Sequence, residues 1–143
     1  MKTVLITGAA HGIGLATARR FAQQGYFVGL YDINQLGLNT VRASGVFPNA
    51  CSGHCDVTSR VSIDTALAKF AIAAGGRLDI LVNNAGVLSA GPFADLDPQA
   101  LDLMVDINVR GMSHVAQAAF PLLKQTPGAC MVKFVFDLQC ARQ

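Results

Sequence analysis

A glycine-rich turn between an apolar strand and a helix constrains this chain more than any other feature. The turn, residues 7–14, reads TGAAHGIG; it follows the apolar run 3–6 and opens a helical pattern over 12–24. Glycine permits backbone angles closed to other residues, a close approach to a pyrophosphate, and tight packing of helix on strand. The free N–H groups at the helix start favour phosphate. The pattern predicts dinucleotide binding through Gly8, Ala10, His11, Gly12, Ile13 and Gly14.

An acidic residue at the end of the second apolar run supports this interpretation. Asp32 follows the run 26–31 and lies 18 residues after Gly14, close to the spacing of about 20 at which a carboxylate binds the hydroxyls of the adenosine ribose. Asp32 would repel a 2′-phosphate, and neither residues 8–14 nor Ile33 supplies an Arg or Lys to bind one. We therefore expect NAD in preference to NADP as the cofactor, with Asp32 and Ile33 on its adenosine side.

Composition excludes several classes of partner. The chain has 143 residues, of which 52% are hydrophobic and 14% charged, with a net charge of +2. This length suits one domain with a real core. Lys and Arg are scattered, so we expect no nucleic acid and no membrane as partner. The apolar run after Lys2 is too short for a signal peptide, and we expect a cytoplasmic location.

The cysteines do not indicate a metal site. Cys51 and Cys55 lie close together, but no further ligand stands nearby at a compatible spacing, and Cys130 and Cys140 form no spacing motif. We expect no metal, and free thiols in a reducing compartment.

Apolar runs alternate with helical patterns along the chain. We expect strands at 3–6, 26–31, within 47–57, at 78–82 and at 129–136. We expect helices at 12–24, 34–43, 59–74 and 98–124, with a long loop at 83–97. The alternation predicts an α/β fold, a doubly wound parallel sheet of about five strands with helices on both faces. Gly8, Asp32, Asp56 and Asn83 each fall at a strand end, so one site can collect all four.

Four motifs in this order resemble the short-chain dehydrogenase/reductase family. They are Thr-Gly-x-x-x-Gly-x-Gly at 7–14, Asp56-Val57 after the third strand, Asn83-Asn84-Ala85-Gly86 after the fourth, and Asn108 in the long helix. The resemblance covers residues 1–132. It implies a Rossmann-type domain and hydride transfer between a nicotinamide and an alcohol or carbonyl. It also implies adenine contacts at Asp56 and Val57, cofactor contacts at Asn83, Ala85 and Gly86, and an active-site role for Asn108, which holds a water in a proton relay.

The chain departs from the family in the residues of acid/base catalysis. The family places a Ser after the fifth strand, then a Tyr, then a Lys four residues beyond the Tyr. This chain has only Tyr26 and Tyr31, both in the second apolar run, and Leu30 and Gln35 stand where the Lys would be. We expect residues 1–143 to be a single, incomplete dinucleotide-binding domain that lacks the family's later strands, with an atypical tail at 133–143.

The tail and the function each leave alternatives open. The stretch 133–140, KFVFDLQC, can be encoded by codons that give Asn-Leu-Ser-Ser when they are translated in the next reading frame. The family typically has Asn-Leu-Ser-Ser at this place. A single-base insertion, a genuine short variant and a deliberately shortened chain all explain it. In the first interpretation, the protein is an oxidoreductase of this family. This chain then retains the NAD-binding half and is catalytically inactive by itself. The alternatives are a non-catalytic dinucleotide-binding or oligomerising module, and an interaction protein or a fragment prone to misfolding.

We also expect self-association, as a dimer or a larger assembly. The apolar residues of 98–124 cover more than one face of that helix, and the fifth strand leaves an apolar sheet edge.

Overall fold

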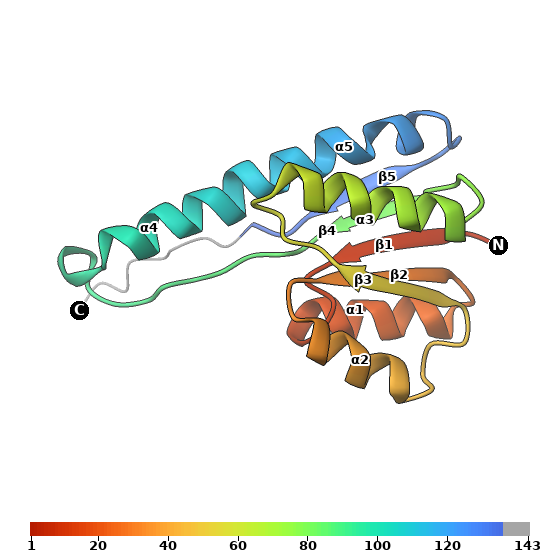
Figure 1. Ribbon diagram of the computed structural model, residues 1–143, viewed down its shortest axis with the longest axis horizontal. Coiled ribbons are helices and arrows are strands. Elements are labelled where there is room, and N and C mark those ends of the chain that lie inside the picture. Colours follow the sequence, from red (N-terminus) through yellow and green to blue (C-terminus); the bar gives the residue numbers. More distant parts are fainter. Residues whose placement is uncertain (136–143) are drawn as a thin grey trace.

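Five parallel strands form one sheet in the computed structural model, which describes residues 1–135 (Figure 1). The strands are β1 (Thr3–Thr7), β2 (Phe27–Asp32), β3 (Ala50–His54), β4 (Ile80–Asn83) and β5 (Cys130–Lys133). Their order is β3-β2-β1-β4-β5, so the winding reverses between β1 and β4. The helices α1 (Gly12–Gln23) and α2 (Gln35–Ala43) cover one face, and α3 (Arg60–Ala73) and α5 (Met112–Lys124) cover the other. The predicted doubly wound parallel sheet is confirmed.

The central strand β1 is buried on both sides, as its unbroken apolar sequence predicts. Successive side chains of a strand point to opposite faces. Val4 and Ile6 join the core under α1 and α2, together with Leu38. Leu5 joins the core under α3 and α5, together with Phe70. Both helix layers therefore hold β1 in place, and the turn at its carboxyl end starts from a fixed point.

Polar side chains begin most of the helices. The Asn34 side chain accepts a hydrogen bond from the Gly37 amide before α2, and Ser59 accepts one from the Ser62 amide before α3. The helix α4 (Pro98–Val105) begins after Asp97 in the same way. His11 precedes α1 but makes no such side-chain bond. The first amides of α1 are therefore not capped by that side chain, which matters for the site.

The long helix predicted at 98–124 is helical throughout but not regular. Between α4 and α5 lies a π-helical segment, η2 (Asp106–Gly111). Gly111 packs so closely against Val57, in the segment after β3, that an added Cβ would lie 2.8 Å from Val57 Cγ2 and 2.9 Å from the Val57 carbonyl oxygen. The loop before the helix also contains a short 3₁₀ turn, η1 (Phe93–Asp95). The π segment is a tertiary feature, since it accompanies contacts with residues far away in the sequence.

The strand β5 is shorter than the apolar run expected at 129–136. Its pairing with β4 runs from Ile80 opposite Cys130 to Asn83 opposite Lys133. Because β4 ends at Asn83, the ladder ends there too, although the Phe134 amide still donates to the Asn83 carbonyl at 3.3 Å. Residues 136–143, with most of the tail expected at 133–143, lie outside the described residues.

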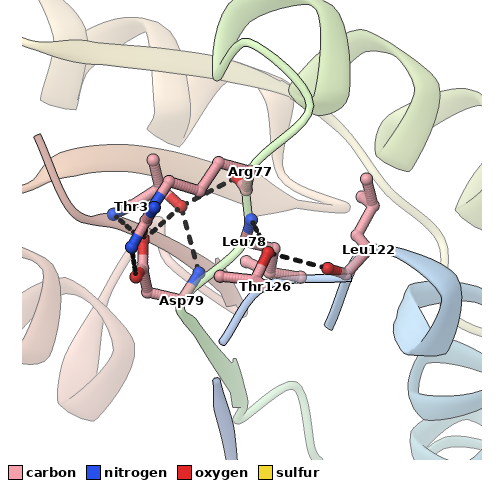
Figure 2. Close-up of polar contacts among 6 residues, drawn as sticks. All are labelled: Thr3, Arg77, Leu78, Asp79, Leu122 and Thr126. Carbon is pink, nitrogen blue, oxygen red and sulfur yellow. Dashed lines mark hydrogen bonds and ion pairs between the residues drawn. The ribbon is translucent and has the colours of Figure 1, made fainter. Parts of the chain in front are cut away.

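A buried carboxylate joins the beginnings of β1 and β4, at the end of the sheet away from the glycine turn (Figure 2). Asp79 Oδ2 accepts hydrogen bonds from the Thr3 amide at 2.9 Å and from Arg77 Nε at 2.7 Å. The Thr3 hydroxyl donates to the Arg77 carbonyl at 2.8 Å and accepts from the Asp79 amide at 3.2 Å. The hydrogen bond from Arg77 holds the pKa of the Asp79 carboxyl below its usual range, against the opposing effect of burial.

We predict that Asp79→Asn lowers the free energy of unfolding by about 1–3 kcal/mol at neutral pH, because charge-assisted hydrogen bonds are lost. The Asp79 pKa is depressed in the folded state, so its contribution is complete above the unfolded value of about 3.9 and is lost as the pH falls through the folded value. In urea unfolding, the difference in the free energy of unfolding between the unchanged chain and the variant should shrink as the pH falls below about 4. Asp64→Asn, which breaks an exposed pair with Arg60, is the control and should change little; equal losses would contradict the prediction.

Candidate functional site

The turns after β1 and β4 form one hydrogen-bonded unit. Gly8 and Gly12 have φ values of +68° and +56°, in the region that favours glycine. The Asn84 side-chain amide donates to the carbonyls of Thr7 at 3.0 Å and Gly8 at 3.2 Å. In return, the Thr7 hydroxyl accepts from the amides of Asn84 and Ala85, both at 3.0 Å. The shape of the glycine turn is therefore set from the neighbouring strand.

Two glycines of the turn have opposite surroundings. At Gly14 an added Cβ would collide with the Gly8 carbonyl oxygen and lie 2.6 Å from Asn84 Nδ2. At Gly12 an added Cβ would meet nothing within 4 Å. Gly14 thus lets α1 approach the turn, while the space beside Gly12 is open. The first turn of α1 contains no acidic residue, so its N–H groups present an uncancelled partial positive charge.

A pocket of about 200 Å³ lies at the carboxyl ends of the strands. It collects residues from five separate segments: the glycine turn, the end of β2, the residues after β3, the loop after β4, and the π segment. The lining residues are Gly8, His11, Asp32, Ile33, Asn34, Cys55, Asp56, Val57, Ala85, Gly86, Val87 and Ile107. Eight predicted site residues lie among them. The lining carries two carboxylates and neither Lys nor Arg, so its charge disfavours an additional anion.

Asp32 is fixed rigidly in this pocket. Its Oδ2 accepts from the Ala10 amide at 2.9 Å, and its Oδ1 accepts from the Asn34 amide at 2.9 Å. The residue is only 6% exposed. Each carboxylate oxygen has a further lone pair for a ligand hydroxyl. Ala10 thus serves the site through its amide, which orients Asp32.

The structure separates Asn83 from the pocket. The Asn83 side chain is fully buried, and its Nδ2 donates to the Met112 carbonyl at 2.7 Å. Its Oδ1 has no hydrogen-bond partner among the described residues. Because side chains alternate along a strand, Asn83 points to the α5 side while Asn84 reaches the glycine turn. The sequence argument chose the first of the two asparagines, and the second makes the contact that shapes the turn.

Asn108 also lies outside the pocket lining, and so do Ile13, Gly12 and Gly14. The Asn108 side chain accepts from the Val87 amide at 2.9 Å and donates to the Val87 carbonyl at 2.7 Å. This pair of hydrogen bonds to the backbone of Val87 fixes one wall of the pocket to the π segment. In the described chain, Asn108 is thus a positioning residue, and its predicted role in a proton relay stays a prediction.

Four lining residues were missed by the sequence argument: Asn34, Cys55, Val87 and Ile107. Burial, then the charges of Asp56 and Asp32, raise the pKa of Cys55 to about 11, so its thiol stays neutral and forms an apolar wall. Cys55 and Val87 directly adjoin predicted motifs, and this adjacency was an available signal. Nothing in the helical pattern marks Ile107.

Residues 1–135 contain neither a candidate metal centre nor a candidate membrane-spanning helix. No group of three His, Cys, Asp or Glu side chains there is placed to hold a metal ion. No helix in that part of the chain is long and apolar enough to cross a bilayer.

Comparisons with known proteins agree on one family. A family model described as short chain dehydrogenase matches residues 2–134. An uncharacterized oxidoreductase of Staphylococcus epidermidis is 38% identical over 128 residues, which are 89% of this chain and 55% of that protein. A sorbitol dehydrogenase of Cereibacter sphaeroides is 38% identical over 117 residues, 82% of this chain and 45% of that protein.

Solved structures give the same result. A 3-ketoacyl-(acyl-carrier-protein) reductase from Brucella melitensis, complexed with NADH, matches with a TM-score of 0.80 and 32% identity, over 87% of this chain and 51% of that one. A short chain dehydrogenase/reductase from Burkholderia phymatum, in complex with NAD, matches with a TM-score of 0.82 and 28% identity, over 92% of this chain and 48% of that one. The chain thus spans about half the length of the proteins it matches.

We predict that Gly14→Ala destabilises the protein by about 1–3 kcal/mol, as overpacking does. Elsewhere in a helix, Gly→Ala stabilises by about 0.5–1 kcal/mol, so the collision with the Gly8 carbonyl reverses the sign. Gly37→Ala in α2 is the comparison, because an added Cβ there would meet side-chain atoms, Asn34 Nδ2 at 2.9 Å and Ala10 Cβ at 3.1 Å, instead of a backbone carbonyl. Its loss of stability should be smaller than that of Gly14→Ala. Urea unfolding measures both, and a Gly14→Ala variant more stable than the unchanged chain would refute the packing argument.

Proposed function

The chain belongs to the short-chain dehydrogenase family, and from this premise we propose that residues 1–143 form a domain that binds NAD for an oxidoreductase. The reaction would transfer hydride between the nicotinamide and an alcohol or carbonyl; this chemistry is supplied by the cofactor when it is bound. One observation carries the proposal: Asp32 is held by two backbone amides beside a glycine turn that is open at Gly12.

The residues of the pocket, together with the adjoining start of α1, suit the parts of a dinucleotide. The start of α1 and the open side of Gly12 suit a pyrophosphate, because backbone N–H groups there can donate to phosphate oxygens. The carboxylate of Asp32 suits the two hydroxyls of the adenosine ribose. Val57 and the neutral thiol of Cys55 offer apolar contact for the adenine. We propose NAD rather than NADP, since a 2′-phosphate would meet the Asp32 carboxylate and no lining cation.

Acid/base chemistry does not come from the described residues in this proposal. Tyr31 lies on β2 and is only 1% exposed, and burial raises its pKa well above its usual value. Tyr26 immediately precedes β2 and also has no Lys four residues on. General acid/base transfer contributes about 10²–10⁴-fold to such reactions. We therefore propose that the 143-residue polypeptide, assayed alone, binds NAD without dehydrogenase turnover at ordinary rates; such turnover in a preparation free of host dehydrogenases would contradict this.

NAD should raise the melting temperature of the chain more than NADP does at equal concentration. Asp32→Asn should weaken NAD binding by about 10- to 100-fold, because charge-assisted bonds of about 1.5–3 kcal/mol to the ribose are lost, and should narrow the difference between the two nucleotides. Thermal shift and calorimetric titration measure both effects.

The matched control for Asp32→Asn is Asp64→Asn, an exposed carboxylate on α3. That variant should bind both nucleotides like the unchanged chain. An equal or larger rise in melting temperature with NADP would contradict the NAD preference. No rise with either nucleotide would contradict the proposed function.

We also propose that the chain associates with itself through its long helix. In residues 1–135, Leu103, Val105, Val109 and Phe120 are between 47% and 59% exposed along that helix, on more than one of its faces, and exposed apolar side chains favour protein contacts. Light scattering at micromolar concentration should show a dimer or a larger assembly. Val109→Glu with Phe120→Glu should reduce it, while Val61→Glu on α3 should not; a strictly monomeric unchanged chain would overturn the proposal.

A further inference from the structure

The outer edge of β5 has no neighbouring strand within residues 1–135, because β5 is the last strand of the sheet (Figure 1). The amides of Cys130 and Phe134 donate to carbonyls next to and at the end of β4, at 2.9 and 3.3 Å. The backbone groups of successive strand residues point alternately to the two sides of the strand. The amides and carbonyls of Met131 and Lys133 therefore lie along the outer edge, where another strand can bind them.

The composition of β5 favours pairing at this edge more than that of β3, which ends the sheet on its other side. The strand β3 contains Ser52 and Gly53, and glycine weakens the interior of a strand. The strand β5 contains Met131 and Val132, and Val132 is 42% exposed. Valine is among the residues that fit a pleated surface best. Of the two edges, β5 is therefore the better template.

One antiparallel register with a second copy uses this edge on both chains. With Val132 opposite Val132 of the second copy, Met131 exchanges its outer hydrogen bonds with Lys133 of that copy, and a two-fold axis repeats the exchange. A slip of two residues in one direction places Lys133 opposite Lys133, and like charges directly opposite each other are destabilising. A slip in the other direction places Lys133 opposite Ala129, whose amide already donates to the Thr126 carbonyl at 3.1 Å.

The same pairing brings the long helices of the two copies together. The helix α5 contacts both β4 and β5 and lies over them on one face of the sheet (Figure 1). When two β5 strands pair, equivalent positions over β4 and β5 in the two copies are separated by two strand spacings, about 9.5 Å. Packed helices have axes about 8–10 Å apart. The strands can therefore pair while α5 packs against α5 of the second copy, in one continuous interface.

We propose that the outer edge of β5 pairs antiparallel with β5 of a second copy, so that the two sheets become one. The partner is a second copy because one edge, repeated by a two-fold axis, supplies both sides of the pairing. The inference rests on the proposed self-association, to which it gives a defined interface. It does not depend on NAD, since no residue of β5 lines the nucleotide pocket.

Analytical ultracentrifugation of the 143-residue chain in reducing buffer measures the dissociation constant of the dimer. Lys133→Pro removes an outward amide, and proline is tolerated at such an edge position. It should raise the dissociation constant about 10- to 100-fold, because a hydrogen bond is lost on each side of the two-fold axis. Lys133→Ala keeps the amide and is the matched control, which should dimerise like the unchanged chain. Circular dichroism checks that both variants are folded.

The outcomes separate this inference from the broader self-association. If Lys133→Pro dimerises as strongly as Lys133→Ala, the copies associate through their helices alone; the inference is then wrong and the self-association stands. A strictly monomeric unchanged chain would overturn both. Loss of nucleotide binding in a chain that still dimerises would contradict the proposed function and leave this interface intact.

Disulfide trapping tests the register without a proline. Val132→Cys, combined with Cys130→Ser and Cys140→Ser, places two thiols directly opposite each other, with Cβ atoms about 4.5 Å apart, within the reach of a disulfide. On mild oxidation this variant should form covalent dimers much faster than Leu36→Cys in the same background, which places a thiol on α2 at a position that is 80% exposed. Equal rates would overturn the register and the inference with it.

Discussion

The side-chain amide of Asn84 is the contact on which the arrangement of the site depends. It joins the carbonyls at the end of β1 to the segment after β4, and the Thr7 hydroxyl returns two bonds in the opposite direction. Gly14 must lack a side chain because α1 packs against this unit. The glycine turn then positions the Ala10 amide, which in turn orients Asp32. One link between neighbouring strands thus sets the glycine turn and, through it, the acidic end of the pocket.

The two ends of the sheet use buried polar groups for different purposes. At the beginnings of β1 and β4, Asp79 is saturated by Thr3 and by Arg77 (Figure 2). Buried polar groups that are fully paired specify a unique arrangement. At the carboxyl ends, Asp32 is held by only two backbone amides and lies at the pocket. A carboxylate with acceptor capacity left over suits ligand binding, whereas a saturated one suits stability.

The long helix connects the walls of the pocket on its other side. Within its π segment, Ile107 is itself a wall, Asn108 binds the backbone of Val87, and Gly111 packs against Val57. Three successive contacts therefore hold the segments after β3 and β4 at a fixed separation. A regular helix advances its side chains by a constant angle, and the wider π turn changes that angle where the contacts occur. Pocket shape and helix irregularity are consequences of the same packing.

The sequence alone was sufficient for the fold and for part of the site. Apolar runs and helical patterns placed most strands and helices within about two residues of their observed ends, because these patterns report local burial. The exceptions are β3, which was expected only somewhere within 47–57, and β5, which is shorter than expected. The glycine turn and Asp32 were identified because their spacing along one chain reflects one strand, one turn and one helix. Tertiary structure alone decided that Asn84 rather than Asn83 shapes the turn, and that Asn108 binds Val87. It also brought Ile107 and Cys55 to the pocket. The physical reason is that a pattern determines where a strand ends, whereas the direction of each side chain depends on the register and packing of distant segments.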